Sequence, residues 1–311
     1  MLDYVFLIVG FILLIKGADF FVDGSASVAR KFRIPTMIIG MTIVAMGTSA
    51  PECAVSIAAS LKGNNSMAIS NVVGSNIFNL MVVCGACAVF SPLAVKASTL
   101  KQEFPLSILA AVLLLVMGKM NMSIGRGEGI ILLGVFVVFL IWMVMETKKA
   151  RNNVQEEEIE ALKGWQCVLY IGVGIAAIVA GGDFVVDSAT AIATTFGLSS
   201  TLIGLTIVAF GTSLPELATS LVAAKKGETD MALGNVIGSN IFNILLVLGV
   251  AGAVSPMEVL MDNLIDDIIL IGMSIIVWIF AWRRKQIGHL HGIVMLGIYA
   301  IYMVYISIRP V

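Results

Sequence analysis

The sequence contains one block of residues twice. GMTIVAMGTSAPE at residues 40–52 is repeated as GLTIVAFGTSLPE at residues 204–216, with 10 of 13 positions identical. A second block, NVVGSNIFN at residues 71–79, is repeated as NVIGSNIFN at residues 235–243 with one substitution. Both pairs are offset by 164 residues. Regular internal similarity of this kind marks a duplicated structural unit, so the chain is expected to fold as two related halves.

The composition places both halves in a membrane. Hydrophobic residues make up 59% of the 311 residues and charged residues only 13%, whereas a soluble domain carries about 25% charged residues. The net charge is -1 and neither a basic face nor a basic tail is present, so no nucleic-acid partner is expected. We therefore expect an all-α integral membrane protein whose main surroundings are the lipid bilayer.

Ten apolar stretches are long enough to cross a bilayer. They are predicted at residues 3–29, 36–61, 66–90, 103–118 and 127–146, and again at 165–193, 200–224, 230–254, 262–282 and 288–308. A polar segment separates the two sets. The chain is accordingly divided into a first repeat at residues 1–147, a cytosolic linker at 148–164 and a second repeat at 165–311.

Lysine and arginine are distributed unevenly between the gaps that separate these spans. Fourteen fall in gaps on one side of the membrane and four on the other. Basic residues favour the cytoplasmic side, so both termini are expected to be extracytoplasmic in a multi-pass protein of the cytoplasmic membrane. Five spans per half is an odd number, which inverts the second half relative to the first. Inverted repeats whose motifs meet at the midplane are typical of secondary transporters and not of enzymes.

Each of the first blocks contains a proline within an apolar span. Pro51 and Pro215 remove a backbone donor and clash with the preceding turn, which predicts broken helices at residues 45–50 and 209–214. Irregular backbone at that depth is tolerated only where it is buried in protein or lines a cavity. The freed carbonyl groups could then bind a cation.

Two glutamates follow the prolines directly. A charge at the centre of a bilayer costs at least about 2.5–3.5 kcal/mol, and such residues are functional by default. Glu52 and Glu216 would repel each other unless a cation lay between them. Hydroxyl and amide groups of the blocks complete the candidate site: Thr48, Ser49, Ser75, Asn79, Thr212, Ser213, Ser239 and Asn243. Oxygen ligands without cysteine or histidine suit Ca²⁺ or Na⁺ better than Zn²⁺ or Cu⁺.

Other residues in or near the repeated blocks are assigned to roles outside the cation site. Gly74 and Gly238 are expected to allow close helix packing. His289 and His291 follow the basic run 283–285 and are expected at the level of the lipid headgroups. Four repeated aspartates are expected at helix ends or interfaces and not as cation ligands: Asp19, Asp23, Asp183 and Asp187.

With these motifs in view, the chain resembles the cation/Ca²⁺ exchanger superfamily, and specifically its prokaryotic sodium/calcium antiporters. The resemblance rests on GTSxPE at residues 47–52 and 211–216 and on GSNIFN at residues 74–79 and 238–243. It implies that the ten side chains named above line a cluster of cation sites, with the carbonyl groups of Ala45 and Ala209 as further Na⁺ ligands. It also implies electrogenic Na⁺/Ca²⁺ exchange without a cofactor, the transported ions being substrates.

One position departs from a common pattern of the superfamily. Asn243 stands where many relatives carry an aspartate, so the site has two carboxylates, which leaves K⁺ co-transport open. An H⁺/Ca²⁺ exchanger is the nearest alternative, although related proton exchangers tend to carry an asparagine where this chain has Thr48-Ser49. A cation channel would not need inverted halves. An intramembrane hydrolase is disfavoured because no HExxH motif occurs.

Overall fold

The computed structural model describes residues 2–61, 65–151, 162–196 and 209–309. Over these residues the chain is almost entirely helical, because a backbone in lipid must satisfy its own hydrogen bonds. The helices of the first half are α1 (Leu2–Phe32), α2 (Thr36–Ile39), α3 (Ala45–Thr48), α4 (Ala50–Leu61), α5 (Asn65–Phe78), α6 (Cys84–Phe90), α7 (Phe104–Asn121) and α8 (Arg126–Arg151). Those of the second half are α9 (Gly164–Thr195), α11 (Ala209–Gly211), α12 (Leu214–Lys225), α13 (Thr229–Phe242), α14 (Leu248–Val254), α15 (Met261–Arg284) and α16 (His289–Ile308).

Short irregular elements interrupt or join the helices. π-helical turns occupy η1 (Gly40–Val44), η2 (Asn79–Val83), η3 (Thr99–Glu103) and η5 (Asn243–Val247). Four two-residue strands, which the sequence analysis did not predict, are β1 (Leu93–Ala94), β2 (Ser123–Ile124), β3 (Met257–Glu258) and β4 (Gln286–Ile287).

Eight helical stretches within the described ranges are long and apolar enough to cross a membrane. A ninth candidate is the bent pair formed by residues 36–48 and 50–57, at the place of the second predicted span. The predicted seventh span, residues 200–224, lies partly outside the described residues. The protein is therefore a multi-pass membrane protein, while the count of ten spans and the boundaries of the two repeats stay predictions.

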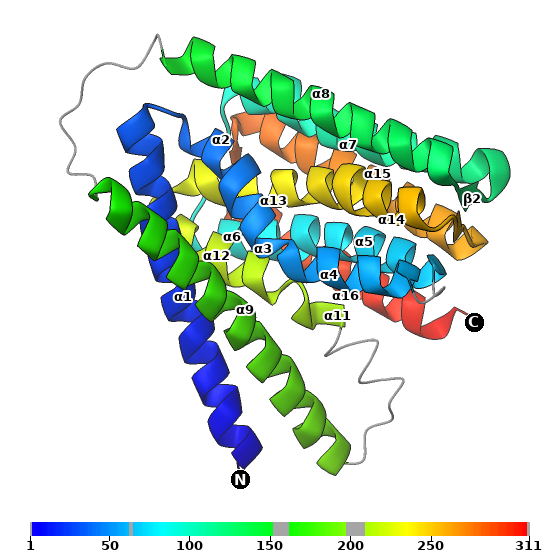
Figure 1. Cartoon of the computed structure of the whole chain (residues 1–311), viewed down its shortest axis with the longest axis horizontal. Helices are drawn as coiled ribbons and strands as arrows, with labels where there is room; N and C mark the ends of the chain where they lie inside the picture. Colours follow the sequence, from blue (N-terminus) through cyan, green and yellow to red (C-terminus); the bar gives the residue numbers. More distant parts are fainter. Residues whose placement is uncertain (1, 62–64, 152–161, 197–208, 310–311) are drawn as a thin grey trace.

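The longest helices of the two halves, α1 and α9, pack against each other and run antiparallel (Figure 1). A Cβ atom on Gly10 would lie 2.9 Å from the carbonyl oxygen of Gly181, and one on Gly17 would lie 2.9 Å from that of Gly174. Under the sequence repeat, Gly10 corresponds to Gly174 and Gly17 to Gly181. The same close contact is thus made twice with the halves exchanged. A reciprocal contact between antiparallel equivalents is what inverted halves require.

Further contacts also exchange partners between the halves. Strand β1 pairs with β4 and strand β2 pairs with β3, so each half contributes one strand to each two-stranded ladder. Helix α6 packs on α16, and its equivalent α14 packs on α8. These reciprocal contacts bring the two copies of each motif into one shared interior.

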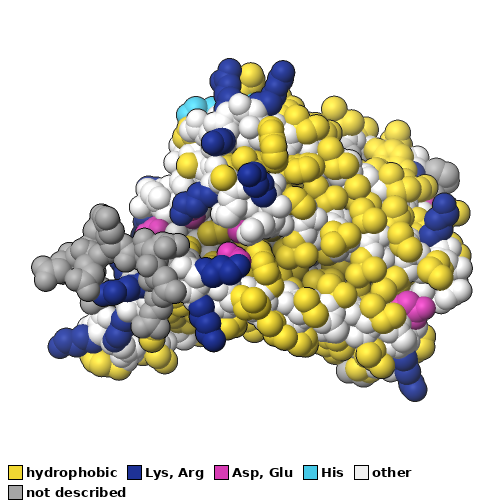
Figure 2. Space-filling model, turned by 90° about the horizontal axis from the view of Figure 1, so that it is seen from above, with side chains coloured by type: hydrophobic (Ala, Val, Ile, Leu, Met, Phe, Trp, Pro, Cys, Tyr) yellow, Lys and Arg dark blue, Asp and Glu magenta, His cyan; other side chains and the backbone are white. Residues whose placement is uncertain are grey.

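The connecting segments form two groups, and the grouping agrees with the predicted topology. Gaps predicted on the cytoplasmic side contact one another: Arg30 Nη1 lies 3.4 Å from Glu228 Oε1, and Lys96 pairs with Asp230. Gaps predicted on the opposite side meet where β2 pairs with β3. Figure 2 shows Lys and Arg side chains gathered towards one end of the molecule, beside a broad hydrophobic band. Which group faces the cytoplasm stays a prediction.

Candidate cation-binding site

Both GTSxPE blocks interrupt their helices at the serine. In the first half α3 ends at Thr48 and α4 begins at Ala50, with a bend of 47° between the two segments. Ser49 (φ −81°, ψ 8°) and Ser213 (φ −96°, ψ 6°) take nearly the same sparsely populated backbone conformation, in which many active-site residues lie. Pro51 and Pro215 follow in the first turn of α4 and α12, where no intrahelical donor is lost. The breaks predicted at residues 45–50 and 209–214 are confirmed.

Two reciprocal hydrogen bonds join the breaks. Ser49 Oγ donates to Glu216 Oε1 over 2.8 Å, and Ser213 Oγ donates to Glu52 Oε1 over 3.0 Å. Each serine therefore binds the glutamate of the other half. Both glutamates are 0% exposed. The crossed bonds fix one oxygen of each carboxylate and bring the two acidic groups into a single buried site.

Several other polar atoms of this site have no hydrogen-bond partner among the described residues. Oε2 of Glu52 and Oε2 of Glu216 are buried, and neither is hydrogen-bonded to a described residue. The same holds for Thr212 Oγ1, Asn243 Oδ1 and both polar atoms of Asn79. A buried polar group without a partner costs about 1–3 kcal/mol, and more when it is charged. Several unpartnered oxygen atoms within one buried site indicate that the site binds a ligand that is coordinated by oxygen atoms.

The second blocks supply amide groups in the same reciprocal manner. Asn76 Nδ2 donates to the carbonyl oxygen of Asn240 over 3.1 Å, and Asn240 Nδ2 donates to that of Asn76 over 3.2 Å. Asn79 and Asn243 each begin a π-helical turn, η2 and η5, and both are fully buried. Single π-turns inside helices are frequent at functional sites. The crossed amide bonds thus hold α5 and α13 together where the site amides lie.

Asn235 was not singled out from the sequence, yet it connects the blocks. Its Oδ1 accepts a hydrogen bond from Thr48 Oγ1 over 3.0 Å, and its Nδ2 donates to Ser220 Oγ over 2.9 Å. The equivalent Asn71 donates to Ser56 Oγ over 3.0 Å. Both asparagines are the first residue of the repeated NVxGSNIFN block, so their identity in the two copies was the available signal.

The other predicted ligands lie close to this network. Ser239 Oγ lies 3.5 Å from Asn235 Oδ1, and Ser75 is buried on α5. The carbonyl oxygen of Ala45 accepts the backbone N–H of Ser49 over 3.0 Å and lies 3.4 Å from Thr48 Oγ1, so its role as a cation ligand remains a prediction. Ala209 is the first residue of α11. Its role as a ligand remains a prediction from the resemblance.

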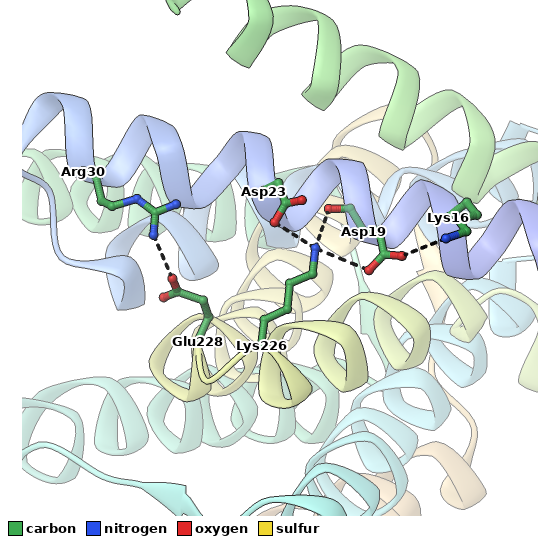
Figure 3. Close-up of polar contacts among 6 residues, drawn as sticks. All are labelled: Lys16, Asp19, Asp23, Arg30, Lys226 and Glu228. Carbon is green, nitrogen blue, oxygen red and sulfur yellow. Dashed lines mark hydrogen bonds and ion pairs between the residues drawn. The ribbon is translucent and has the colours of Figure 1, made fainter. Parts of the chain in front are cut away.

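The four repeated aspartates lie within long helices and not at helix ends, with Asp19 and Asp23 in α1 and Asp183 and Asp187 in α9. Their position at the membrane interface stays a prediction. Lys226 Nζ donates to Asp23 Oδ1 over 2.8 Å and lies 3.3 Å from Asp19 Oδ1, so these two carboxylates tie α1 to the end of α12 (Figure 3).

A Cβ atom on Gly238 would lie 2.6 Å from Met41 Cα, which confirms close packing at that glycine. For Gly74 no described atom lies within 4 Å, and residues 201–208, equivalent to the partner segment, lie outside the description.

The chemistry of this site suits a hard cation. It combines two carboxylates, hydroxyl groups and side-chain amides, and in the described part of the chain no three His, Cys, Asp or Glu side chains are placed so that they could hold a metal ion together. Ca²⁺ accepts six to eight oxygen ligands in flexible geometry, whereas Zn²⁺ prefers nitrogen and sulfur. Broken helices with free oxygens provide such a ligand set.

Comparisons with known proteins agree with this geometry. A family model described as "Sodium/calcium exchanger protein" matches residues 2–145 and 167–308. The inner membrane protein YrbG of Escherichia coli (strain K12) is 38% identical over 96% of this chain and 94% of its own length. The sodium/calcium exchanger MaX1 of Methanosarcina acetivorans is 31% identical over 97% of both chains. A structure of the sodium-calcium exchanger NCX_Mj, soaked with 10 mM Na⁺ and 10 mM Sr²⁺, superposes with a TM-score of 0.86 at 34% identity and covers 99% of each chain.

Proposed function

Because the chain belongs to the sodium/calcium exchanger family, we propose that it is a secondary active antiporter that exchanges Na⁺ for Ca²⁺ by alternating access. In this proposal Na⁺ runs inward through the cytoplasmic membrane and drives Ca²⁺ outward, with both termini extracytoplasmic. The similarity to a protein named as an inner membrane protein supports that location.

One observation carries the proposal, namely the crossed pair of serine–glutamate bonds. Glu52 and Glu216 come from opposite halves, are fully buried and each keep one oxygen that has no partner among the described residues. Two uncompensated carboxylates in a dry interior are strongly unfavourable, and a bound cation offsets that cost. One Ca²⁺ or two Na⁺ would neutralise them.

The shared carboxylates also provide the coupling. If Ca²⁺ and Na⁺ require the same oxygens, one ion set must leave before the other binds. A loaded site carries little net charge and can change its access from one face to the other, whereas an empty site with two negative charges should not. The proposed ligands are those predicted from the sequence: Glu52, Glu216, Thr48, Ser49, Ser75, Asn79, Thr212, Ser213, Ser239, Asn243 and the carbonyl groups of Ala45 and Ala209.

An H⁺/Ca²⁺ exchanger is the second candidate, since carboxylates can bind H⁺ as well as Na⁺. Purified protein in proteoliposomes separates the two. Under an imposed Na⁺ gradient, with the pH gradient collapsed by an ionophore, ⁴⁵Ca²⁺ uptake is expected to follow the Na⁺ gradient. Uptake that requires a pH gradient and ignores Na⁺ would identify the proton exchanger. Ca²⁺ flux without any counter-ion would indicate a channel.

A further inference from the structure

A basic hollow of about 720 Å³ lies where α15 passes into α16, away from the cation site. Its lining includes Arg283, Arg284, His289 and His291, together with Leu290, and no acidic side chain. Neither arginine forms an ion pair with a described residue. Figure 2 shows a histidine beside basic side chains at the end of the molecule where Lys and Arg gather. The hollow is thus an unneutralised positive site.

The two histidine rings are fixed in place. His291 Nδ1 accepts the backbone N–H of Gly288 over 3.2 Å, and its ring stacks on Phe280 with 4.6 Å between centroids. His289 Nδ1 lies 2.7 Å from the carbonyl oxygen of Val89. His291 Nδ1 is an acceptor, so Nε2 of that ring carries the hydrogen and is available as a donor towards a ligand. His289 Nδ1 instead donates to the carbonyl oxygen of Val89, so Nε2 of the neutral His289 ring is an acceptor. The N–H groups of the first turn of α16 add further donors, since they have no intrahelical acceptor.

The first half contains the same backbone arrangement with different charges. Met122 ends α7 at φ 50° as Lys285 ends α15 at φ 51°, and a short strand and a glycine follow in each case. In the first half the backbone N–H of Gly125 is capped by Glu128 Oε2 over 3.0 Å. In the second half His291 takes the place of that glutamate. An acidic side chain normally complements the positive end of a helix dipole, so α16 lacks the internal anion that α8 has.

The surroundings of the hollow place it at the boundary of the hydrocarbon. Phe90 and Leu290 are 75% and 71% exposed, and Trp282 is 53% exposed. Exposed apolar side chains beside basic groups are typical of the membrane interface, where aromatic residues and arginines meet lipid headgroups. A ligand with a phosphate group and acyl chains would satisfy both surfaces, whereas free phosphate would leave the apolar rim uncovered.

We propose that this hollow binds the phosphate headgroup of an anionic phospholipid. Arg283 and Arg284 provide the charge, and His291 and the first turn of α16 provide directed donors. The acyl chains lie along Phe90 and Leu290. This end of the molecule is the one expected to be cytoplasmic, where anionic lipids are common.

The test compares lipids and variants in the full-length protein. Thermal unfolding and lipid retention in native mass spectrometry are measured with added phosphatidylglycerol, phosphatidylcholine or inorganic phosphate. Phosphatidylglycerol alone is expected to stabilise the wild type. In the double variant Arg283→Gln/Arg284→Gln its apparent affinity is expected to fall on the order of tenfold or more, because each basic side chain near an anionic surface contributes about 1 kcal/mol.

Two further variants separate lipid binding from folding. His291→Glu restores the cap found at Glu128, so it is expected to keep the unfolding temperature in phosphatidylcholine and to lose the preference for phosphatidylglycerol. Arg126→Gln is the control, because Arg126 follows Gly125 in the first half as His289 follows Gly288 in the second, and this variant is expected to retain that preference. Equal stabilisation of the wild type, the double variant and His291→Glu by phosphatidylglycerol would overturn the proposal. So would equal stabilisation of the wild type by phosphatidylcholine or by inorganic phosphate.

Discussion

Glu52 and Glu216 each use one carboxylate oxygen to contact the opposite half, and the other oxygen has no partner within the part of the chain that the structure describes. The two oxygens of each carboxylate therefore have different roles. The bonded oxygen orients the group, and the unpartnered oxygen is available to a cation. The structure thus shows which oxygen of each glutamate is hydrogen-bonded, which the number of acidic residues in the sequence could not show.

Replacement of either glutamate by glutamine removes charge and keeps size. Breaking a buried charge pair costs about 3–5 kcal/mol, so Ca²⁺ exchange by Glu52→Gln or Glu216→Gln is expected to fall roughly a hundredfold or more. The measurement is Na⁺-dependent ⁴⁵Ca²⁺ flux in proteoliposomes, with size-exclusion profiles to show that the variants are folded. Glu258→Gln, at an exposed carboxylate on β3, is the matched control. Normal flux in either site variant would remove that glutamate from the site.

The crossed serines give a second prediction. Ser49→Ala removes the donor to Glu216, and Ser213→Ala removes the donor to Glu52. A hydrogen bond to a charged group contributes about 1.5–3 kcal/mol, so each variant is expected to bind Ca²⁺ about ten- to a hundredfold more weakly, and the two losses should be similar. Isothermal titration in detergent measures the affinities.

Thr42→Val serves as the control for the serine variants. Thr42 lies in the same broken span, but its hydroxyl donates within its own helix, to the carbonyl oxygen of Ile38 over 2.7 Å. The Thr42→Val variant should bind Ca²⁺ with the affinity of the wild type. If Ser49→Ala behaved like Thr42→Val while Ser213→Ala did not, the reciprocity of the site would be refuted.

At the scale of the element, the decisive features are departures from regular helix. The breaks at Ser49 and Ser213 and the π-helical turns at Asn79 and Asn243 all lie in the repeated blocks. Proline made the breaks predictable, because its ring excludes a continuous helix. The π-turns have no comparable signal, since they depend on how neighbouring helices pack.

Close packing of α13 on the first broken span depends on glycine. A Cβ atom on Gly238 would lie 2.6 Å from Met41 Cα, closer than atoms can approach. Gly238→Ala is therefore expected to lower stability by about 1–3 kcal/mol through forced separation of the helices. Thermal unfolding in detergent measures this loss.

The glycine control lies on α15. No described atom is within 4 Å of a Cβ placed on Gly272, which is exposed. Gly272→Ala should leave the unfolding temperature unchanged or raise it, because alanine favours a helix by up to about 1 kcal/mol. A similar loss in both variants would mean that helix propensity, and not packing, decides the result at Gly238.

At the scale of the whole molecule, α1 and α9 form a paired unit whose glycine contacts are reciprocal. The ion pairs of Lys226 with Asp19 and Asp23 join this unit to α12, and Arg30 adds a contact to Glu228 (Figure 3). We expect α1 and α9 to move together relative to the other helices during exchange. The contacts of Lys226 would then hold one end of the unit closed.

Replacement of Lys226 tests that role. Partly exposed ion pairs contribute about 0–1 kcal/mol, so Lys226→Met is expected to shift the closed population a few-fold and not to unfold the protein. Spin labels at the exposed positions Lys31 and Lys225 should then show an additional longer distance. Lys149→Met is the control, since Lys149 pairs with Glu146 of its own helix. Identical distance distributions in both variants would exclude a closing role.

Much of this protein was determined by its sequence alone. Apolar length marks the spans, two prolines mark the broken helices, and exact repetition marks the acids and amides, because each of these properties is carried by a local stretch of residues. Only the tertiary structure decided which half supplies the partner of each group. The bonds from Ser49 to Glu216 and from Thr48 to Asn235 arise where the two halves meet. Contacts between segments more than 160 residues apart leave no local pattern, so no reading of one segment could contain them.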